Sequence, residues 1–169
     1  MSLDIISCKH VDKNGSSTRL PLWCYNPDGT KCSWYRQCLE KRYPCEQTGS
    51  AYAITYAEKF CDLYAKNVHM FSTYGRQWIA ASKKCLQVVL APVLSPEVNI
   101  SCSDIKSMAF ASHPKCYSNP SEGFSFCSLS LRDKLEVFWT IKEALLSAFE
   151  ETVKAAWATV LDCLKVGTD

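Results

Sequence analysis

Apolar residues recur every three or four positions through much of the chain, the spacing that places them on one face of an α-helix. This spacing predicts amphipathic helices over residues 50–66 and 73–91. Pro92 is expected to end or bend the second helix, because proline lacks an N–H group and its ring clashes with the preceding turn. A shorter helix is predicted over residues 32–40. The pattern is typical of a helical protein.

A further helix is predicted to begin at Ser101, which is followed three residues later by Asp104. A serine and an acidic residue at this distance can satisfy the free N–H groups at a helix start. We expect this helix to run through about Ala111 and to stop at Pro114. Residues 115–127 are then expected to form a loop.

The strongest helical pattern lies in the last segment. Ser130 and Asp133 form another capping pair, and there is neither Gly nor Pro between residues 124 and 166. The apolar positions at helical spacing are Leu131, Leu135, Phe138, Ile141, Leu145, Phe149, Val153, Ala156, Val160 and Cys163. Ser147 and Glu150 form a capping pair inside this segment, so the pattern leaves open one long helix or two helices joined by a turn.

Residues 1–31 differ from the rest because turn-forming residues dominate them. The segments Asn14-Gly15-Ser16-Ser17 and Asn26-Pro27-Asp28-Gly29 combine residues that accept a positive φ with a proline that presets φ. We predict loops here, with a short hairpin around Asp28-Gly29. The chain thus consists of a loop-rich N-terminal arm, residues 1–31, and a helical part, residues 32–169, within one domain.

The overall composition is that of an ordinary globular protein, with 47% apolar and 21% charged residues. The net charge is +2, and the basic residues are interleaved with acidic ones. No run of Lys or Arg suggests a nucleic-acid or anionic-membrane surface. No apolar run approaches the ~20 residues that a membrane-spanning helix requires. We therefore expect no nucleic-acid partner and no membrane span.

The cysteines are the most informative feature of the composition. Metal sites require tight pairs such as C-x2-C, redox sites require C-x-x-C, and the chain has neither. The eleven cysteines lie at positions 8, 24, 32, 38, 45, 61, 85, 102, 116, 127 and 163. We expect disulfides formed in an oxidising compartment, and no bound metal or other cofactor. The predicted fold class is all-α, a disulfide-stapled domain of four or five helices.

The same reasoning predicts a secreted, extracellular protein. The first residues, Met1-Ser2-Leu3-Asp4, lack the basic and apolar regions of a signal peptide, which we expect to have been removed. The cysteine count is odd, so one cysteine is left for a free thiol or for a bridge to a second chain, as in a homodimer. Asn14 and Asn99 begin N-x-S sequons and are candidate glycosylation sites.

Sequence motifs of enzymes are absent. None of the three histidines, His10, His69 and His113, lies in a nucleophile, zinc or calcium motif. We interpret each as a structural residue and expect no catalytic site. The alternative is a lysozyme-like hydrolase or defence protein, in which two carboxylates face each other across a cleft. The candidate carboxylates for that alternative are Glu40, Glu46, Glu58 and Asp62.

A cluster of aromatic residues, Trp34, Tyr35, Tyr52 and Tyr56, allows two interpretations. Large aromatic side chains fill small cores, and packing between disulfides is the interpretation that we favour. Aromatic residues that remain exposed would instead mark a ligand groove or a partner surface.

From Cys24 to Cys163, the order and spacing of ten cysteines resemble those of the stanniocalcins, secreted disulfide-rich glycoprotein hormones. Short segments also resemble that family: Cys38-Leu39-Glu40 before Cys45, Gly75-Arg-Gln-Trp78-Ile79 before Lys84-Cys85-Leu86, and Lys115-Cys116-Tyr117-Ser118 before Cys127. The sequon that follows Cys-Leu-Glu in the family is missing here, where residues 41–44 read Lys-Arg-Tyr-Pro.

The resemblance implies a set of disulfides and a role. The implied pairs are Cys24–Cys38, Cys32–Cys61, Cys45–Cys102, Cys85–Cys116 and Cys127–Cys163. The cysteine left over is then Cys8, whereas the family's chain-joining cysteine lies beyond the last intramolecular one, so the family's covalent dimer is not implied. Family members influence calcium and phosphate handling, and vertebrate members inhibit a pappalysin-type metalloproteinase. The expected function is therefore that of a secreted signalling or binding protein with an extracellular protein partner. A matrix component is a further alternative.

The implied Cys127–Cys163 pair conflicts with one unbroken helix in the last segment. A straight helix over residues 131–163 would be about 48 Å long at 1.5 Å per residue. A disulfide requires Cα atoms within roughly 7 Å of each other. We expect a hairpin with a turn near Ser147 and Glu150. The other possibilities are that this pair does not form, or that Cys127 reaches Cys163 of a second, antiparallel chain.

Overall fold

The structure, a computed structural model, describes residues 20–142, 153, 154, 156, 158, 159 and 163. Within this part of the chain helices predominate and no β-strand occurs, apart from an isolated bridge between Ser121 and Phe124. The prediction of an all-α fold is confirmed. None of the helices described is long and apolar enough to cross a membrane.

Four α-helices have both ends among the described residues: α1 (Lys59–Asn67), α2 (Thr73–Leu90), α3 (Cys102–Ser118) and α4 (Leu131–Ile141). The residues described between 153 and 163 are helical as well. Two π-helical segments precede α1, and they are η2 (Tyr35–Glu40) and η4 (Tyr52–Glu58). The 3-10 turns are η1 (Leu22–Cys24), η3 (Cys45–Thr48), η5 (Val68–Met70), η6 (Ala91–Leu94) and η7 (Phe126–Ser128). The helices predicted over 32–40, 50–66 and 73–91 are therefore present. Helix α2 ends just before Pro92, and the chain continues as the 3-10 turn η6.

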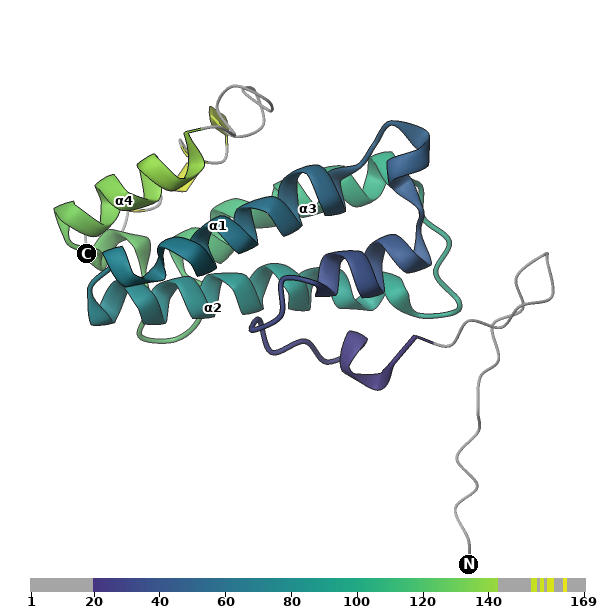
Figure 1. The fold of residues 1–169 in the computed structure, drawn as a ribbon, viewed down its shortest axis with the longest axis horizontal. Coiled ribbons are helices and arrows are strands. Elements are labelled where there is room, and N and C mark those ends of the chain that lie inside the picture. Colours follow the sequence, from purple (N-terminus) through teal and green to yellow (C-terminus); the bar gives the residue numbers. More distant parts are fainter. Residues whose placement is uncertain (1–19, 143–152, 155, 157, 160–162, 164–169) are drawn as a thin grey trace, which may run out of the picture.

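Short connections make successive helices antiparallel. Segment η4 continues directly into α1, and α2 and α3 then run back and forth beside it (Figure 1). Helix α2 packs against α3, while α4 lies against α1 at one end of the molecule (Figure 1). This arrangement places the end of α3 and the start of α4 close together, where the candidate site described below is found.

The aromatic cluster predicted from the sequence belongs mostly to the core. Trp34, Tyr35 and Tyr52 are buried, and Tyr56 is half-buried. The indole N–H of Trp34 donates a hydrogen bond of 2.9 Å to the backbone carbonyl of Cys24. Leu20 and Cys24 lie in the same core, so the described part of the N-terminal arm is packed onto the helices.

Two predicted helix starts are capped as expected. The hydroxyl of Ser101 accepts a hydrogen bond from the N–H of Asp104 at 3.1 Å, and that of Ser130 accepts one from the N–H of Asp133 at 3.1 Å. Each bond satisfies one N–H group that has no partner within its own helix.

The prediction that Pro114 stops a helix is wrong, because α3 continues through Ser118. A proline inside a helix costs about 3 kcal/mol, since it removes one hydrogen bond and strains the preceding turn. Contacts after the proline compensate for this cost. Cys116 is buried and bonded to Cys85, and the indole N–H of Trp78 donates to the carbonyl of Tyr117 at 3.0 Å. The loop expected from residue 115 therefore begins only after residue 118.

The hairpin expected around Asp28-Gly29 is also absent from the structure, which has a turn without strands there. The Asp28 carboxylate accepts hydrogen bonds from the N–H of Thr30 at 2.8 Å and from its hydroxyl at 2.6 Å. Gly29 has a φ of +82°, and a Cβ atom there would lie 2.6 Å from the backbone nitrogen of Lys84. The turn is thus held against α2, and it has no neighbouring strand to pair with.

Five disulfides join the described residues: Cys24–Cys38, Cys32–Cys61, Cys45–Cys102, Cys85–Cys116 and Cys127–Cys163. They are the pairs that the stanniocalcin resemblance implies. The Cα atoms of Cys127 and Cys163 are 5.2 Å apart, which rules out a straight helix from residue 131 to residue 163. The turn expected near Ser147 and Glu150, like His10, Cys8 and Asn14, lies outside the described residues.

Candidate functional site

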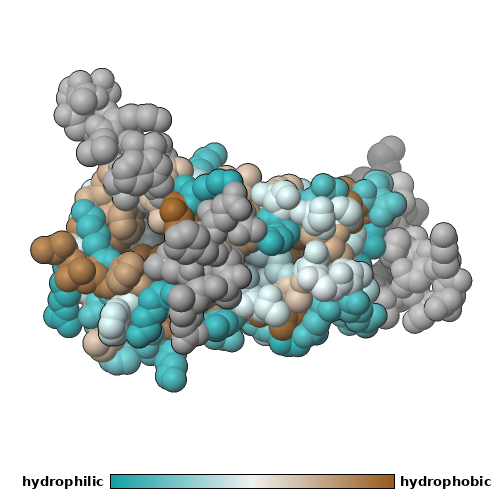
Figure 2. All heavy atoms as spheres, turned by 90° about the horizontal axis from the view of Figure 1, so that it is seen from above, coloured by the Kyte–Doolittle hydropathy of each residue, from teal (hydrophilic) through white to brown (hydrophobic). Residues whose placement is uncertain are grey.

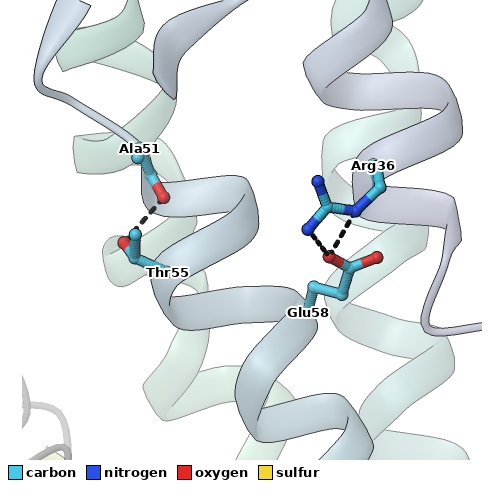
Figure 3. Close-up of polar contacts among 4 residues, drawn as sticks. All are labelled: Arg36, Ala51, Thr55 and Glu58. Atoms are coloured by element: carbon cyan, nitrogen blue, oxygen red, sulfur yellow. Dashed lines mark hydrogen bonds and ion pairs between the residues drawn. The ribbon is translucent and has the colours of Figure 1, made fainter. Parts of the chain in front are cut away.

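None of the four carboxylates proposed for a hydrolytic cleft lines either of the two cavities described below. Glu58 accepts two contacts from Arg36, with its Oε2 atom 2.7 Å from Nη2 and 3.0 Å from Nε (Figure 3). This ion pair links η2 to η4. On the first turn of η4, the hydroxyl of Thr55 donates to the carbonyl of Ala51 at 2.7 Å (Figure 3). The polar groups of this segment thus serve local structure.

The other three acids have separate positions. Glu40 accepts a hydrogen bond of 2.8 Å from the backbone N–H of Glu46, at the start of η3. The side chain of Glu46 is exposed, and Asp62 is exposed on α1. Among the described residues, no group of three or more His, Cys, Asp or Glu is placed to hold a metal ion.

The two described histidines differ in environment. His69 is exposed in η5, directly after α1, and its Nδ1 atom lies 3.1 Å from the carbonyl oxygen of Lys66. His113 is buried, and its Nε2 atom lies 3.2 Å from the hydroxyl of Tyr52. Burial lowers the pKa of His113 to about 4, so its ring is uncharged at neutral pH.

Aromatic rings surround His113. The ring centroids of Phe110, Tyr117 and Tyr56 lie 5.0, 5.4 and 5.8 Å from that of the imidazole. These distances are typical of favourable ring contacts. The rings come from η4 and α3, and the disulfide Cys85–Cys116 fixes the second of these helices to α2. His113 is therefore held in an apolar, aromatic environment.

A cavity of about 150 Å³ opens beside these rings, between the end of α3, η7 and α4. Its wall includes Tyr56, Trp78, His113, Tyr117, Phe126 and Val137. Ala156 and Thr159 line it as well. Sequence reasoning did not find this cavity. Its residues come from six different segments of the chain, and no local pattern marks them.

Helix α4 has apolar residues on two opposite faces. Val137 and Ile141 pack inward, next to the buried side chain of Asp133. On the other face, 74% of Leu131, 61% of Leu135 and 63% of Trp139 remain exposed, and Phe138 is exposed beside them. The helical spacing of the sequence places Leu131, Leu135, Phe138 and Ile141 in one apolar stripe. In the structure only Ile141 of these four packs against the core, and the other three are exposed to solvent.

These four exposed residues, Leu131, Leu135, Phe138 and Trp139, are called the α4 face below. They lie at spacings of three, four, seven and eight residues, so they form one continuous surface on the helix. The ammonium group of Lys142 lies 3.8 Å from the centroid of the Trp139 ring. Figure 2 shows hydrophobic side chains protruding at the end of the molecule where α4 lies in Figure 1.

Of the two candidate glycosylation sites, the structure describes only Asn99. It is exposed in the loop before α3, where a glycan has room. The hydroxyl of Ser101, which completes the sequon, donates to the carboxylate of Asp104 at 2.6 Å and caps α3.

Comparisons of the chain with protein-family models, with curated proteins and with solved structures find no match.

Proposed function

We propose that this protein is a secreted, non-catalytic signalling or binding protein that acts through an extracellular protein partner, as stanniocalcins do. In this proposal the partner binds at the α4 face. The observation that supports it most is the exposure of Trp139 and Leu135 together on one helix.

The chemistry of the α4 face suits recognition of a protein. Single exposed apolar residues are common on any protein, but four neighbouring large ones on one helix are not. Tryptophan is enriched among the residues that contribute most to binding at protein interfaces. The nearby Lys142 supplies a charge at the edge of this surface. An apolar centre with a polar rim is the usual arrangement of such interfaces.

The disulfides support an extracellular location. Five bridges in one chain are typical of proteins that fold in an oxidising compartment. Because their pairs are also those implied by the stanniocalcin resemblance, they favour a hormone-like role over a matrix component. The absence of catalysis is part of the proposal, and it is supported by the ion pair that engages Glu58 and by the enclosed position of His113.

Affinity capture from extracellular fluid of the source organism tests the proposal. The bait is the disulfide-intact protein, compared with a double variant, Leu135→Ser and Trp139→Ser. The control is Leu22→Ser on η1, because Leu22 is also a strongly exposed leucine but lies away from α4. We expect one protein to be retained by the wild type and the control and lost with the double variant. Retention by all three baits, or by none, would contradict the proposal.

A further inference from the structure

A second, deeper cavity lies next to the cavity beside α4 and shares part of its wall. The deeper cavity has a volume of about 30 Å³ and lies among η4, α1, α2 and α3. Four residues line both cavities: Tyr56, Trp78, His113 and Tyr117. The two spaces therefore adjoin each other at these four side chains, and they are called the outer and the inner part of the site below.

The inner part carries two hydroxyl groups without a protein partner. The hydroxyls of Tyr64 and Ser82 are buried, and neither has a hydrogen bond to any described residue. Both residues line the inner cavity. A buried hydroxyl left without a partner costs about 1–3 kcal/mol. A polar atom located in this cavity would recover that free energy.

The outer part is suited to an apolar ring. Its wall is formed mainly by aromatic and aliphatic side chains, among them Trp78, Tyr117, Phe126 and Val137. Apolar cavities of about 150 Å³ in other proteins take up molecules of the size of benzene. The volume here is of the same size.

The surroundings disfavour a charged ligand. Burial keeps His113 uncharged by lowering its pKa to about 4, and it also lowers the pKa of Lys83 beside the inner cavity. The ammonium group of Lys134, at the outer wall, donates to the carbonyl of Cys127 at 3.0 Å. An anion in this site would lose its hydration beside an uncharged histidine and a mainly apolar wall, which costs more than the burial of a neutral ring.

We propose that the two adjoining cavities together bind a small neutral aromatic alcohol of the size of phenol. The ring occupies the outer part, next to Trp78 and Val137, and the hydroxyl points inward to Tyr64 and Ser82. Phe138 belongs both to the α4 face and to the wall of the outer cavity, but the phenol site does not depend on the proposed protein partner.

Titration of the intact, oxidised protein with phenol, followed by ¹H–¹⁵N NMR, tests the site directly. We expect the indole N–H signal of Trp78, which donates to Tyr117, to shift and saturate. Benzene should bind about threefold to tenfold more weakly, because it lacks one hydrogen bond. Benzoate serves as the charged comparison. No shift at Trp78 with phenol, or benzoate binding as tightly as phenol, would overturn the inference.

Variants then separate the two parts of the site. Val137→Phe fills the outer cavity and should weaken phenol binding by about tenfold or more, while Val88→Phe, at an exposed position on α2, should leave it unchanged. Ser82→Ala removes one inner hydroxyl and should weaken phenol binding while leaving benzene binding unchanged. If Val137→Phe does not fold, the Ser82→Ala comparison decides. Equal phenol affinity in Ser82→Ala and wild type would show that the phenol hydroxyl does not bind Ser82 in the inner cavity, and would contradict the proposal.

Discussion

The carboxylate of Asp133 accepts two hydrogen bonds from Ser72. The backbone N–H of Ser72 donates one at 2.9 Å, and the hydroxyl of Ser72 donates the other at 2.6 Å. The hydroxyl of Ser130 donates to the same carboxylate at 2.9 Å. Ser72 is the N-cap of α2 and Ser130 the N-cap of α4, so one buried side chain joins the starts of two helices. Such contacts to a charged acceptor are among the stronger hydrogen bonds in proteins.

Replacement of Asp133 by Asn should destabilise the protein by about 2–3 kcal/mol, because an amide cannot accept all of these hydrogen bonds and leaves a buried donor without a partner. Asp104→Asn is the matched control, since Asp104 accepts from its own N-cap Ser101 at an exposed helix start. We expect the control to lose less than about 1 kcal/mol. Urea unfolding with the disulfides intact measures both, and equal losses would contradict the role of Asp133.

The same carboxylate should make stability depend on pH. Burial by itself raises the pKa of Asp133, but the hydrogen bonds from Ser72 and Ser130 outweigh burial and lower that pKa below its ordinary value. A carboxyl group whose pKa is lower in the folded than in the unfolded state stabilises the fold at neutral pH. That stabilisation is lost as the pH falls below about 4 and through the folded-state pKa.

The pH effect is measured as the difference in unfolding free energy between wild type and Asp133→Asn. Because the variant has no group to titrate at this position, the comparison removes the contribution of all other acids. We expect the difference to be large at neutral pH and to shrink at about pH 3 and below. A difference that stays constant with pH would show that the ionised form of Asp133 is not what stabilises the fold.

Gly75 is the residue that allows Asp133 to come so close to α2. A Cβ atom at Gly75 would lie 2.8 Å from Oδ1 of Asp133 and 2.9 Å from its Cγ atom. Gly75→Ala should therefore destabilise the protein, although alanine is the better helix former by about 1 kcal/mol. In an Asp133→Ala background the same change should become neutral or stabilising. A double-mutant cycle on unfolding free energies measures this coupling, and additive effects would disprove it.

The disulfides predict a thiol count. With the five bridges formed, titration of the denatured, non-reduced protein should find at most one reactive thiol per chain, which would be Cys8. After reduction the same titration should find all eleven cysteines. Several reactive thiols before reduction would speak against oxidative folding and thus against secretion.

The local features of the fold could be predicted from the sequence. Helical spacing located α1, α2 and much of α3 and α4, and the capping pairs that begin at Ser101 and Ser130 are read from neighbouring residues. Pro114 was misjudged because its effect is set by distant contacts. The bonds that hold the chain after it come from Cys85 and Trp78, on another helix.

The candidate sites were harder to foresee for the same reason. Asp133 was recognised as a cap of its own helix, but its bonds to Ser72 span 61 residues. The α4 face follows the same helical spacing as a buried stripe, so the sequence alone does not tell which side of α4 is covered. The exposed position of Trp139 depends on how α4 packs against α1. The cavity beside His113 exists only once η7 and α4 fold against α3.

The affinity of the captured partner for variants of the α4 face tests the proposed function most directly. Surface plasmon resonance would compare wild type, Trp139→Ala and Leu22→Ala, all with intact disulfides. If Trp139 is central to the interface, its truncation should weaken binding by about 30-fold, the equivalent of 2 kcal/mol, while Leu22→Ala should leave the affinity unchanged. Equal affinities for wild type and Trp139→Ala would contradict the proposal that this protein acts through the α4 face.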